Sequence, residues 1–470
     1  MKKTTIVFFS LLLAGSISAQ ETTTHLSLDS CRTLAICNNK ELRMADMKQR
    51  AAWYERKAAF TKYLPRVSAT GAYLHTDKEI SLLSDEQKST LGNLGTTVGS
   101  LIPALESMTS TLNGVGSGLA EALHTDTRNM GAVAVMLTQP VYMGGKIVAY
   151  NRITRYAEQI AARQHDLALQ EVIIEVDEVY WQIVSLQNKK RLAESFLKLV
   201  QKLDNDVQQM ITEGVATKAD GLSVKVKVNE AKVALIQVDN GLSLSRMLLC
   251  QLCGLEMDTP ITLADENTDT ITIPMFSATT MADVQTAFAH RPELHALSLS
   301  TDIYKEKVRL ARAEFMPTVV LTGGWLGSNP SVFNSFERQF KGMWNVGVMV
   351  NIPIVTWGER CYKVKAARAE ERLALYRLEE TREKVELQVS QSRQKVEEAC
   401  ERLHTATRSR EEADENLRYA TLGLQEGVIP VSNVLEAQTA WLSAHSEYVS
   451  AQIDLRLADL YLHKSLGILK

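Results

Sequence analysis

Proline is scarce in this chain, with 10 residues in 470. Because proline interrupts helices, its scarcity leaves room for very long ones. The formal net charge is only -3, which gives no reason to expect a nucleic-acid partner. Beyond the N-terminus, no stretch approaches the roughly 18 unbroken apolar residues of a membrane helix. The composition therefore disfavours both a nucleic-acid-binding protein and a helical membrane protein.

Patterns for metal binding and catalysis are also missing. The nine histidines include no H-E-x-x-H, and among six cysteines only Cys250 and Cys253 form a C-x-x-C, with no second pair at zinc spacing. We interpret the two thiols as small apolar residues on the last turn of a helix that ends at Gly254. Redox or metal chemistry is the alternative, and whether the two cysteines pair stays open. We predict no enzyme, no cofactor and no metal site.

The N-terminus has the pattern of a secretory signal peptide. Lys2 and Lys3 precede an apolar run from Ile6 to Ala14, followed by small residues through Ala19. The alternative, a buried N-terminal helix, fits neither the charged start nor the small-residue end. We expect residues 1–19 to be removed and the mature protein to be exported, either as a soluble protein or as a β-barrel.

A tandem duplication organises the rest of the chain. The phrase QEGVIPVSNVLEA at 425–437 echoes TEGVATKADGLSV at 212–224, and the same offset of 213 relates Pro140 to Pro353. Upstream, Pro65 and Pro317 differ by 252. The first copy therefore carries about 39 extra residues within 75–131. This Gly, Ser and Thr-rich stretch is typical of a surface loop, with room for a short helix around 101–112.

Each copy predicts the same order of elements: a helix that ends before a proline, two strands and a helical hairpin. The first repeat is 20–257, the inter-repeat segment is 258–280, and the second repeat is 281–470. We expect the opening helices at about 28–63 and 282–315, and strands at about 66–75, 132–141, 318–327 and 344–354. The hairpins are expected at 145–254 and 358–466, with their tips at Gly214 and Gly427.

The strands have the length that a tilted membrane strand needs, about ten residues. In NVGVMVNI, Val346, Val348, Val350 and Ile352 alternate with Asn345, Gly347, Met349 and Asn351. Aromatic residues gather near strand ends, as in a membrane girdle or in the core of a soluble sandwich; both readings stay open.

The helices that follow the second strand of each copy carry a heptad seam. In the first copy, positions seven apart from Val172 are mostly apolar, as are those from Val176. The second copy repeats the seam with a row of Ser and Ala, which lets helices approach closely. At 1.5 Å per residue, each such helix is on the order of 100 Å long. A Gly turn then reverses the chain into a second helix.

Four strands cannot close a barrel, and an open sheet edge is not tolerated in lipid. The pattern therefore predicts an oligomer, and three chains would supply twelve strands.

The chain resembles the TolC family of outer-membrane efflux and secretion channels. The resemblance rests on the duplication, the L-P before the first strand, the junctions QPVYMGG and IPIVTWGER, and the two Gly-tip phrases. It covers essentially the whole mature chain. It implies a mainly α protein with a membrane β-barrel: a homotrimer whose shared twelve-stranded barrel spans the cell outer membrane and whose α-helical tunnel crosses the periplasm. The segment 258–280 would join an equatorial belt.

The same resemblance implies a passive exit duct for a tripartite efflux or type I secretion system. The partners would be a periplasmic adaptor protein, an inner-membrane pump and outer-membrane lipid, with no nucleic acid. The runner-up is an exported coiled-coil scaffold or adhesin without a membrane barrel. The transported substrate is not predicted.

The tips supply the candidate site residues. The family's second tip has two acidic residues at the periplasmic entrance, and Asn433 and Glu436 stand at the matching positions. The first ring is thus neutral here, and Glu436 is either a gate residue or a solvated helix residue. The adaptor-docking candidates are Gly214, Val215, Gly427 and Val428, whose other reading is a plain hairpin turn.

Overall fold

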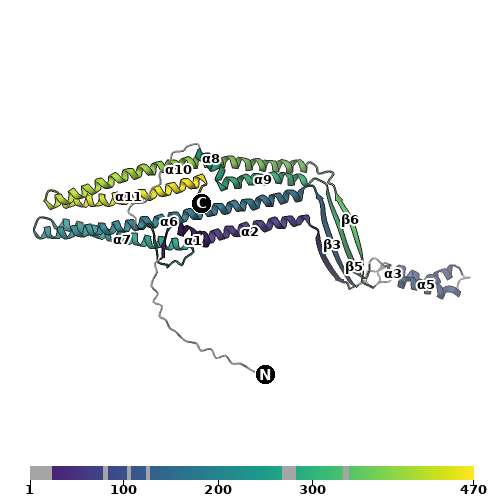
Figure 1. Ribbon diagram of the computed structural model, residues 1–470. Helices are drawn as coiled ribbons and strands as arrows, with labels where there is room; N and C mark the ends of the chain where they lie inside the picture. Colours follow the sequence, from purple (N-terminus) through teal and green to yellow (C-terminus); the bar gives the residue numbers. More distant parts are fainter. Residues whose placement is uncertain are drawn as a thin grey trace, which may run out of the picture. The chain divides into compact units, whose positions relative to one another are not determined.

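The computed structural model describes residues 24–77, 83–102, 107–122, 128–266, 282–331 and 338–469. The predicted signal peptide and residues 267–280 of the inter-repeat segment lie outside this range. Figure 1 shows the elements along the chain. In order they are β1 (Thr24–Leu26), α1 (Leu28–Asn38), α2 (Lys40–Phe60), η1 (Thr61–Tyr63), β2 (Arg66–His75), α3 (Asp85–Gly92), α4 (Leu94–Leu101), α5 (Thr109–Ala122), β3 (Asn129–Met143), α6 (Lys146–Thr212), α7 (Lys218–Cys253), β4 (Ile261–Leu263), α8 (Ala282–His290), α9 (Pro292–Ala313), β5 (Thr318–Asn329), β6 (Lys341–Asn351), α10 (Glu359–Gln425) and α11 (Val431–Leu466).

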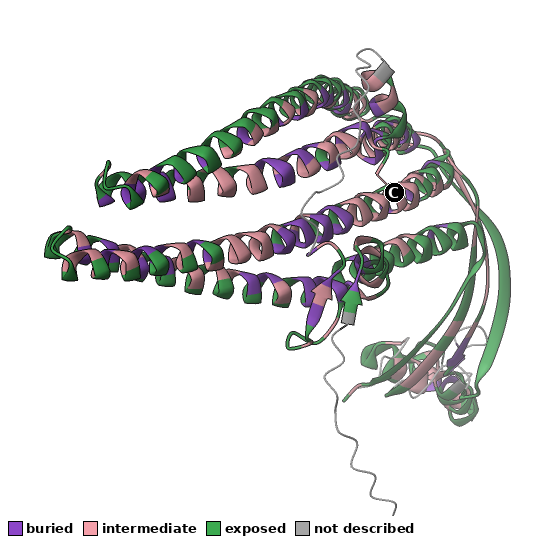
Figure 2. Ribbon diagram, turned by 60° about the vertical axis from the view of Figure 1, so that its left-hand side comes forward, coloured by how far each residue is buried: buried purple, intermediate pink, exposed green. Residues whose placement is uncertain are grey.

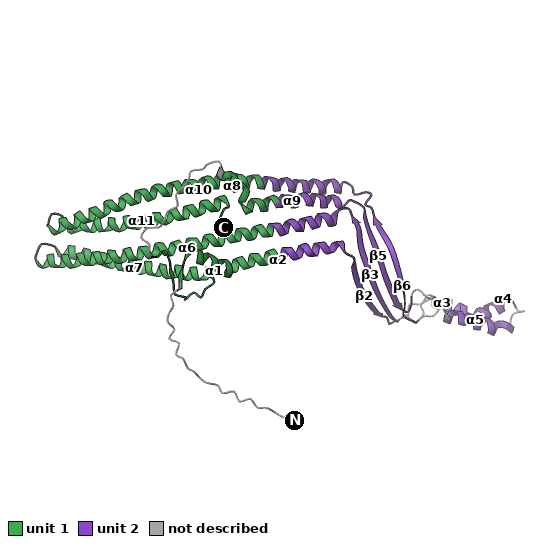
Figure 3. Cartoon of the chain, viewed as in Figure 1, with its two compact units in different colours: residues 1–50, 160–298, 377–470 green, residues 51–159, 299–376 purple. Residues whose placement is uncertain are grey.

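The chain packs as two compact units, coloured separately in Figure 3. One consists of the residues up to Arg50, Ile160–Ser298 and Arg377–Lys470; the other consists of Ala51–Gln159 and Leu299–Tyr376. The first unit holds the greater part of both helical hairpins. The second holds the strands and the helical ends next to them. Each unit therefore draws on both sequence repeats.

The two helical hairpins have helices of the same lengths at equivalent positions in the two repeats. Helices α6 and α10 both have 67 residues, and α7 and α11 both have 36. Their starting residues, Lys146 and Glu359, are separated by the offset of 213 that the sequence predicts. The long helices, the reversals and the returning helices are therefore confirmed at nearly the expected bounds.

The predicted heptad seam is buried along its length, as the recurring buried residues on the long helices in Figure 2 illustrate. Near the tips, α6, α7, α10 and α11 contribute to one shared hydrophobic cluster, which contains Val200, Val207, Val224, Leu424 and Val434. Two of the polar residues that interrupt the seam, Lys190 and Arg410, interact with other side chains. Lys190 pairs with Asp239, and the Arg410 guanidinium lies over the Tyr448 ring at 4.2 Å.

The four predicted strands form one antiparallel sheet in the order β2-β3-β5-β6. The order follows the chain, so each strand pairs with its sequence neighbour, and the two outer strands β2 and β6 pair with no further strand among the described residues. β2 matches its prediction at both ends, and β3 and β5 extend two or three residues beyond predicted ends. β6 is shifted: it begins three residues before the predicted start and ends at Asn351, three residues before the predicted end at 354.

The two faces of the sheet differ in polarity because side chains alternate along each strand. Val67 lies opposite Leu137, and Gly323 opposite Val346, on one largely apolar face. The neighbouring pairs, Arg66 with Thr138 and Ser68 with Met136, belong to the more polar face. All residues of β2 and β6 are exposed in the single chain.

The opening helix of each copy was predicted as continuous, and this is wrong. The first copy breaks at Asn39, whose side chain accepts a hydrogen bond from the Glu41 N–H at 2.7 Å. The second breaks at Arg291, the residue before Pro292, where proline disfavours helical backbone. The two breaks are 252 residues apart and therefore belong to the duplication.

The insertion in the first copy is more ordered than a loop. Helices α3, α4 and α5 pack on one another. The predicted short helix at 101–112 overlaps the end of α4 and the start of α5, and its residues 103–106 lie outside the described ranges. Glycine permits the close packing: a Cβ on Gly95 would lie 2.2 Å from the Thr109 carbonyl oxygen, and one on Gly116 would lie 1.9 Å from that of Leu91. The glycines that suggested a loop thus let helices touch.

A two-stranded parallel sheet joins β1 to β4, with Thr24 opposite Ile261 and Leu26 opposite Leu263. No sequence pattern predicted this sheet, which holds the start of the described chain against the first part of the inter-repeat segment. Over the described residues, none of the helices is both long and apolar enough to cross a membrane.

Candidate functional site

The two hairpin tips have the same backbone geometry. Gly214 and Gly427 adopt positive φ angles of 78° and 70°, which suit glycine because it has no Cβ. In the first tip, the Val215 N–H donates to the Met210 carbonyl at 2.8 Å and the Gly214 N–H donates to that of Ile211 at 3.2 Å. This pair of hydrogen bonds defines the Schellman motif that ends a helix.

The second tip repeats both hydrogen bonds one copy later. The Val428 N–H donates to the Gly423 carbonyl at 2.8 Å, and the Gly427 N–H donates to that of Leu424 at 3.0 Å. The predicted reversals at Gly214 and Gly427 are therefore confirmed as helix-ending turns.

The returning helices start differently in the two tips. Thr217 caps α7 through a reciprocal capping box with Asp220, and the hydrogen bonds from Thr217 lower the pKa of that exposed carboxyl. Helix α11 instead starts after Pro430 and has no side-chain cap. Ser432 and Asn433 lie in its first turn, where the Asn433 N–H donates to the Pro430 carbonyl at 3.2 Å. The second tip is therefore the less firmly capped of the two.

A compensating exchange of volume also distinguishes the tips. Four residues before the turn glycine, the first copy has Met210 and the second has Gly423. The residue that lies against this position is Ala216 in the first copy and Ile429 in the second, where a Cβ on Gly423 would lie 3.0 Å from Ile429 Cγ1. A large and a small residue thus face each other in both tips, with their places exchanged.

A groove of about 500 Å³ lies between the tips of the two hairpins of one chain. Its lining includes Met210, Val215, Gly427, Val434 and Gln438. Two of the four predicted docking residues, Val215 and Gly427, therefore line one groove, although they lie in different repeats.

The valines at the tips are prominently exposed. Val215 has 67% of its surface accessible and Val428 has 77%, although valine is usually buried. Gly214 and Val428 do not line the groove, and their tips form its margins. Exposed apolar side chains beside a groove are typical of a surface that a partner covers.

The two entrance candidates lie on another side of α11. Asn433 and Glu436 are both exposed and are three residues apart, so they share a face of the helix. Val434 and Gln438, which line the groove, lie on a face of α11 that is rotated by roughly 150° from the face of Asn433 and Glu436, because successive helical residues turn by about 100°. Within the described part of the chain, Glu436 makes no ion pair. Gate candidates and groove thus occupy separate surfaces.

Gln438 is a site residue that the sequence analysis missed. Its side chain is only 3% exposed, it lines the groove, and its Oε1 atom has no hydrogen-bond partner among the described residues. An unpaired buried amide oxygen is costly unless a partner or water satisfies it. A polar residue within the buried row Val431, Val434, Ala437 was the available signal.

The cysteine pair lies away from the tips and is part of the core. Cys250 and Cys253 are fully buried, α7 ends at Cys253, and Gly254 adopts the left-handed conformation after it. Burial raises the pKa of the Cys250 thiol, which disfavours the reactive thiolate. In the described ranges, no three His, Cys, Asp or Glu side chains are grouped as metal ligands would be.

The chain resembles outer membrane efflux proteins. The family model "Outer membrane efflux protein" matches residues 32–255 and 284–468, which include both repeats. Among curated proteins, the outer membrane protein TolC of Vibrio cholerae is 20% identical over 341 residues, covering 72% of this chain and 77% of that protein. Protein CyaE of Bordetella pertussis is 24% identical over 350 residues, covering 71% and 70%.

Solved structures of the same kind share the fold. The crystal structure of the outer membrane protein VceC from Vibrio cholerae covers 94% of this chain and 96% of its own, with a TM-score of 0.72 and 16% identity. The family model spans most of the chain and both of its repeats, and the sequence resemblance pointed to the same group. The protein belongs to the outer membrane efflux protein family, the TolC-like channels of the outer membrane.

Proposed function

We propose that three copies of this chain form one channel through the outer membrane, the passive exit duct of a tripartite efflux or type I secretion system. The observation that carries the proposal is the four-stranded sheet with two unpaired edges. Strands β2 and β6 expose every residue, and the sheet has one apolar face. Because lipid cannot satisfy open strand edges, such a sheet requires copies that pair β6 of one chain with β2 of the next.

The helical hairpins support the same arrangement. Each long helix of 67 residues extends on the order of 100 Å, a length suited to a periplasmic tunnel. Three chains would bring six tips together, and we assign these tips to the periplasmic entrance. A scaffold or adhesin would not need the unpaired sheet, and membership of a channel family disfavours it.

We assign the groove between the tips to a periplasmic adaptor protein that acts with an inner-membrane pump. The support is local: Val215 and Gly427 line the groove, and Val428 is exposed at its margin. Apolar contacts of this kind, with exposed backbone at a glycine turn, suit the tip of a partner helix. We propose no enzymatic activity and no cofactor for the chain.

We place Glu436 at the constriction of the entrance, where three symmetric carboxylates would attract cations. Asn433, one turn before it, would contribute a neutral ring. Because Glu436 has no ion-pair partner in the described chain, its charge is available to permeating ions.

Planar-bilayer recordings of the purified protein test this function. We expect ion-conducting channels that multivalent cations block, and Glu436→Gln should weaken the block because the ring loses its charge. Glu213→Gln, a charge removal at the other tip, is the matched control. A protein that never conducts would refute the channel, and an unchanged block in Glu436→Gln would remove Glu436 from the constriction.

A further inference from the structure

The helical segments next to the strands carry an excess of positive charge. Residues 51–65, 144–159, 299–317 and 355–376 together contain 15 Lys or Arg and 8 Asp or Glu, whereas the whole chain has a net charge of -3. All four segments belong to the unit that contains the sheet. The cations are therefore concentrated beside the strands, where the proposed function places the membrane boundary.

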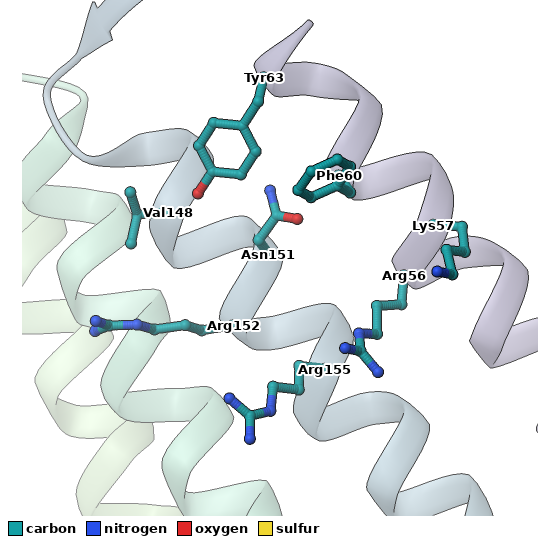
Figure 4. A pocket seen from close by; sticks show the side chains of 8 residues that line it. All are labelled: Arg56, Lys57, Phe60, Tyr63, Val148, Asn151, Arg152 and Arg155. Carbon is teal, nitrogen blue, oxygen red and sulfur yellow. The ribbon is translucent and has the colours of Figure 1, made fainter.

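A pocket of about 460 Å³ gathers several of these cations between α2 and α6. Figure 4 shows Arg56 and Lys57 from α2 and Arg152 and Arg155 from α6 around the opening, with the Phe60 and Tyr63 rings at the end nearer the strands. No acidic side chain lines the pocket. Its chemistry is thus cationic at one end and aromatic at the other.

The cations of the pocket differ in how far they are already neutralised. Arg56 pairs with Glu158 at 2.7 Å, and Arg152 approaches Glu306 at 3.3 Å. Lys57 has only a ring contact, with its Nζ 5.2 Å from the Trp53 centroid. Arg155 is exposed and makes no ion pair within the described residues. An anionic ligand would therefore stabilise the charge of the Arg155 guanidinium, which lies between two other guanidinium groups and makes no ion pair among the described residues.

Backbone chirality places the pocket on the side of the apolar sheet face. The Thr76 N–H donates to the Arg128 carbonyl, so even-numbered residues of β2 bond toward β3 and odd-numbered ones, such as Val67, bond away. For L-residues, β3 then lies to the left when the Val67 face is viewed with β2 running upward.

Helix α2 leads into β2, and β3 leads into α6. Helix α6 therefore lies on the same side of α2 as β3 lies of β2. The Asn151 amide contacts the Ala59 carbonyl, so Ala59 faces α6. A right-handed turn of about 100° from Ala59 then brings Phe60 toward the viewer of the Val67 face. The pocket therefore opens on the face that lipid would cover.

We infer that this pocket binds the headgroup of an anionic phospholipid at the inner boundary of the outer membrane. Arg155, with Arg152 and Arg56 on either side of it, would hold the phosphate through charge-assisted hydrogen bonds, and Phe60 and Tyr63 would lie against the start of the acyl chains. Basic pockets beside membrane segments take such headgroups. The inference rests on the membrane placement in the proposed function.

Native mass spectrometry of the detergent-solubilised protein with added phosphatidylglycerol tests this assignment. The expected result is a bound lipid whose affinity falls about tenfold in Arg155→Gln, the loss of about one charge-assisted contact. Arg155 makes no ion pair among the described residues, so folding should be unaffected. Arg163→Gln removes the same charge from the same helix outside the pocket and should bind as the unchanged protein does.

Each other outcome has a definite meaning. Equal binding by Arg155→Gln and the unchanged protein would overturn the site, as would equal binding of zwitterionic phosphatidylcholine. Displacement of the lipid by inorganic phosphate at comparable concentration would assign the pocket to free phosphate and overturn the lipid assignment. Because bilayer conductance is recorded separately, an Arg155→Gln channel that conducts but retains no lipid distinguishes this inference from the proposed function.

Discussion

The exchanged pair at the two tips gives a sharp test of how the repeats are packed. Replacing Gly423 by Met copies the residue of the first tip into the second while Ile429 remains large. A Cβ at this position would lie 3.0 Å from Ile429 Cγ1 and 3.1 Å from its Cδ1, so the longer methionine side chain must displace the isoleucine. The double variant Gly423→Met/Ile429→Ala reproduces this pair of residues as it stands in the first tip.

The expected change in the stability of the second tip in Gly423→Met is the sum of two opposing effects. Overpacking a well-packed contact costs about 1–3 kcal/mol. Removing glycine from a helix gains about 0.8–1 kcal/mol. The single variant should therefore destabilise the tip by about 1 kcal/mol, which corresponds to about a fivefold increase in local opening. The double variant keeps the helical gain without the overpacking and should be at least as stable as the unchanged tip.

Hydrogen exchange measured by mass spectrometry reads this opening directly in the detergent-solubilised protein. The probe is the Val428 N–H, which donates to the Gly423 carbonyl. We expect faster exchange over residues 423–431 in the single variant and recovered protection in the double variant, with no change at the first tip. A single variant as protected as the unchanged protein, or a double variant no better than the single one, would refute the reasoning.

Three further predictions concern other parts of the chain. Arg32→Met should destabilise the contact between α1 and α6 by about 2–3 kcal/mol, because Asp177 is 2% exposed and loses the guanidinium that donates hydrogen bonds to it. This cost is below the usual 3–5 kcal/mol for breaking a buried ion pair, because the Arg32 side chain is 27% exposed. Faster hydrogen exchange in α1 checks it, and unchanged exchange would contradict it. The Asp459 side chain raises the pKa of His463 above 6.5, so its contribution is fully present below that pH and is lost as pH rises through the folded-state pKa. Thermal unfolding of His463→Gln should therefore show a deficit at pH 5.5 that disappears at high pH, and a deficit that grows with pH would have the wrong sign. Cys250→Ala/Cys253→Ala should conduct as the unchanged protein does in bilayers, because both thiols lie in the core; lost conductance in a folded variant would restore a chemical role for the pair.

The sequence predicted those parts of the fold that the duplication states twice. Helices α6 and α10 could be bounded because the same Gly phrase ends both, and the Schellman turns follow from glycine at the reversal. The strands followed from the prolines before them and from alternation. A pattern that occurs twice at a fixed offset is stronger evidence than either copy alone.

The parts that the sequence could not predict depend on contacts between distant residues. Strands β1 and β4 have three residues each, too few for a pattern, and pair across more than 230 positions. The glycines of the insertion allow helices to touch or a loop to bend, and only packing decides which. The groove and Gln438 required the relative placement of two hairpin tips, which no local pattern contains.

The mass of the detergent-extracted particle tests the central claim most directly. Native mass spectrometry of protein extracted from the membrane fraction should give a protein mass three times that of one mature chain, because four strands with two open edges require neighbouring copies. A stable monomer that is recovered without detergent would contradict the account.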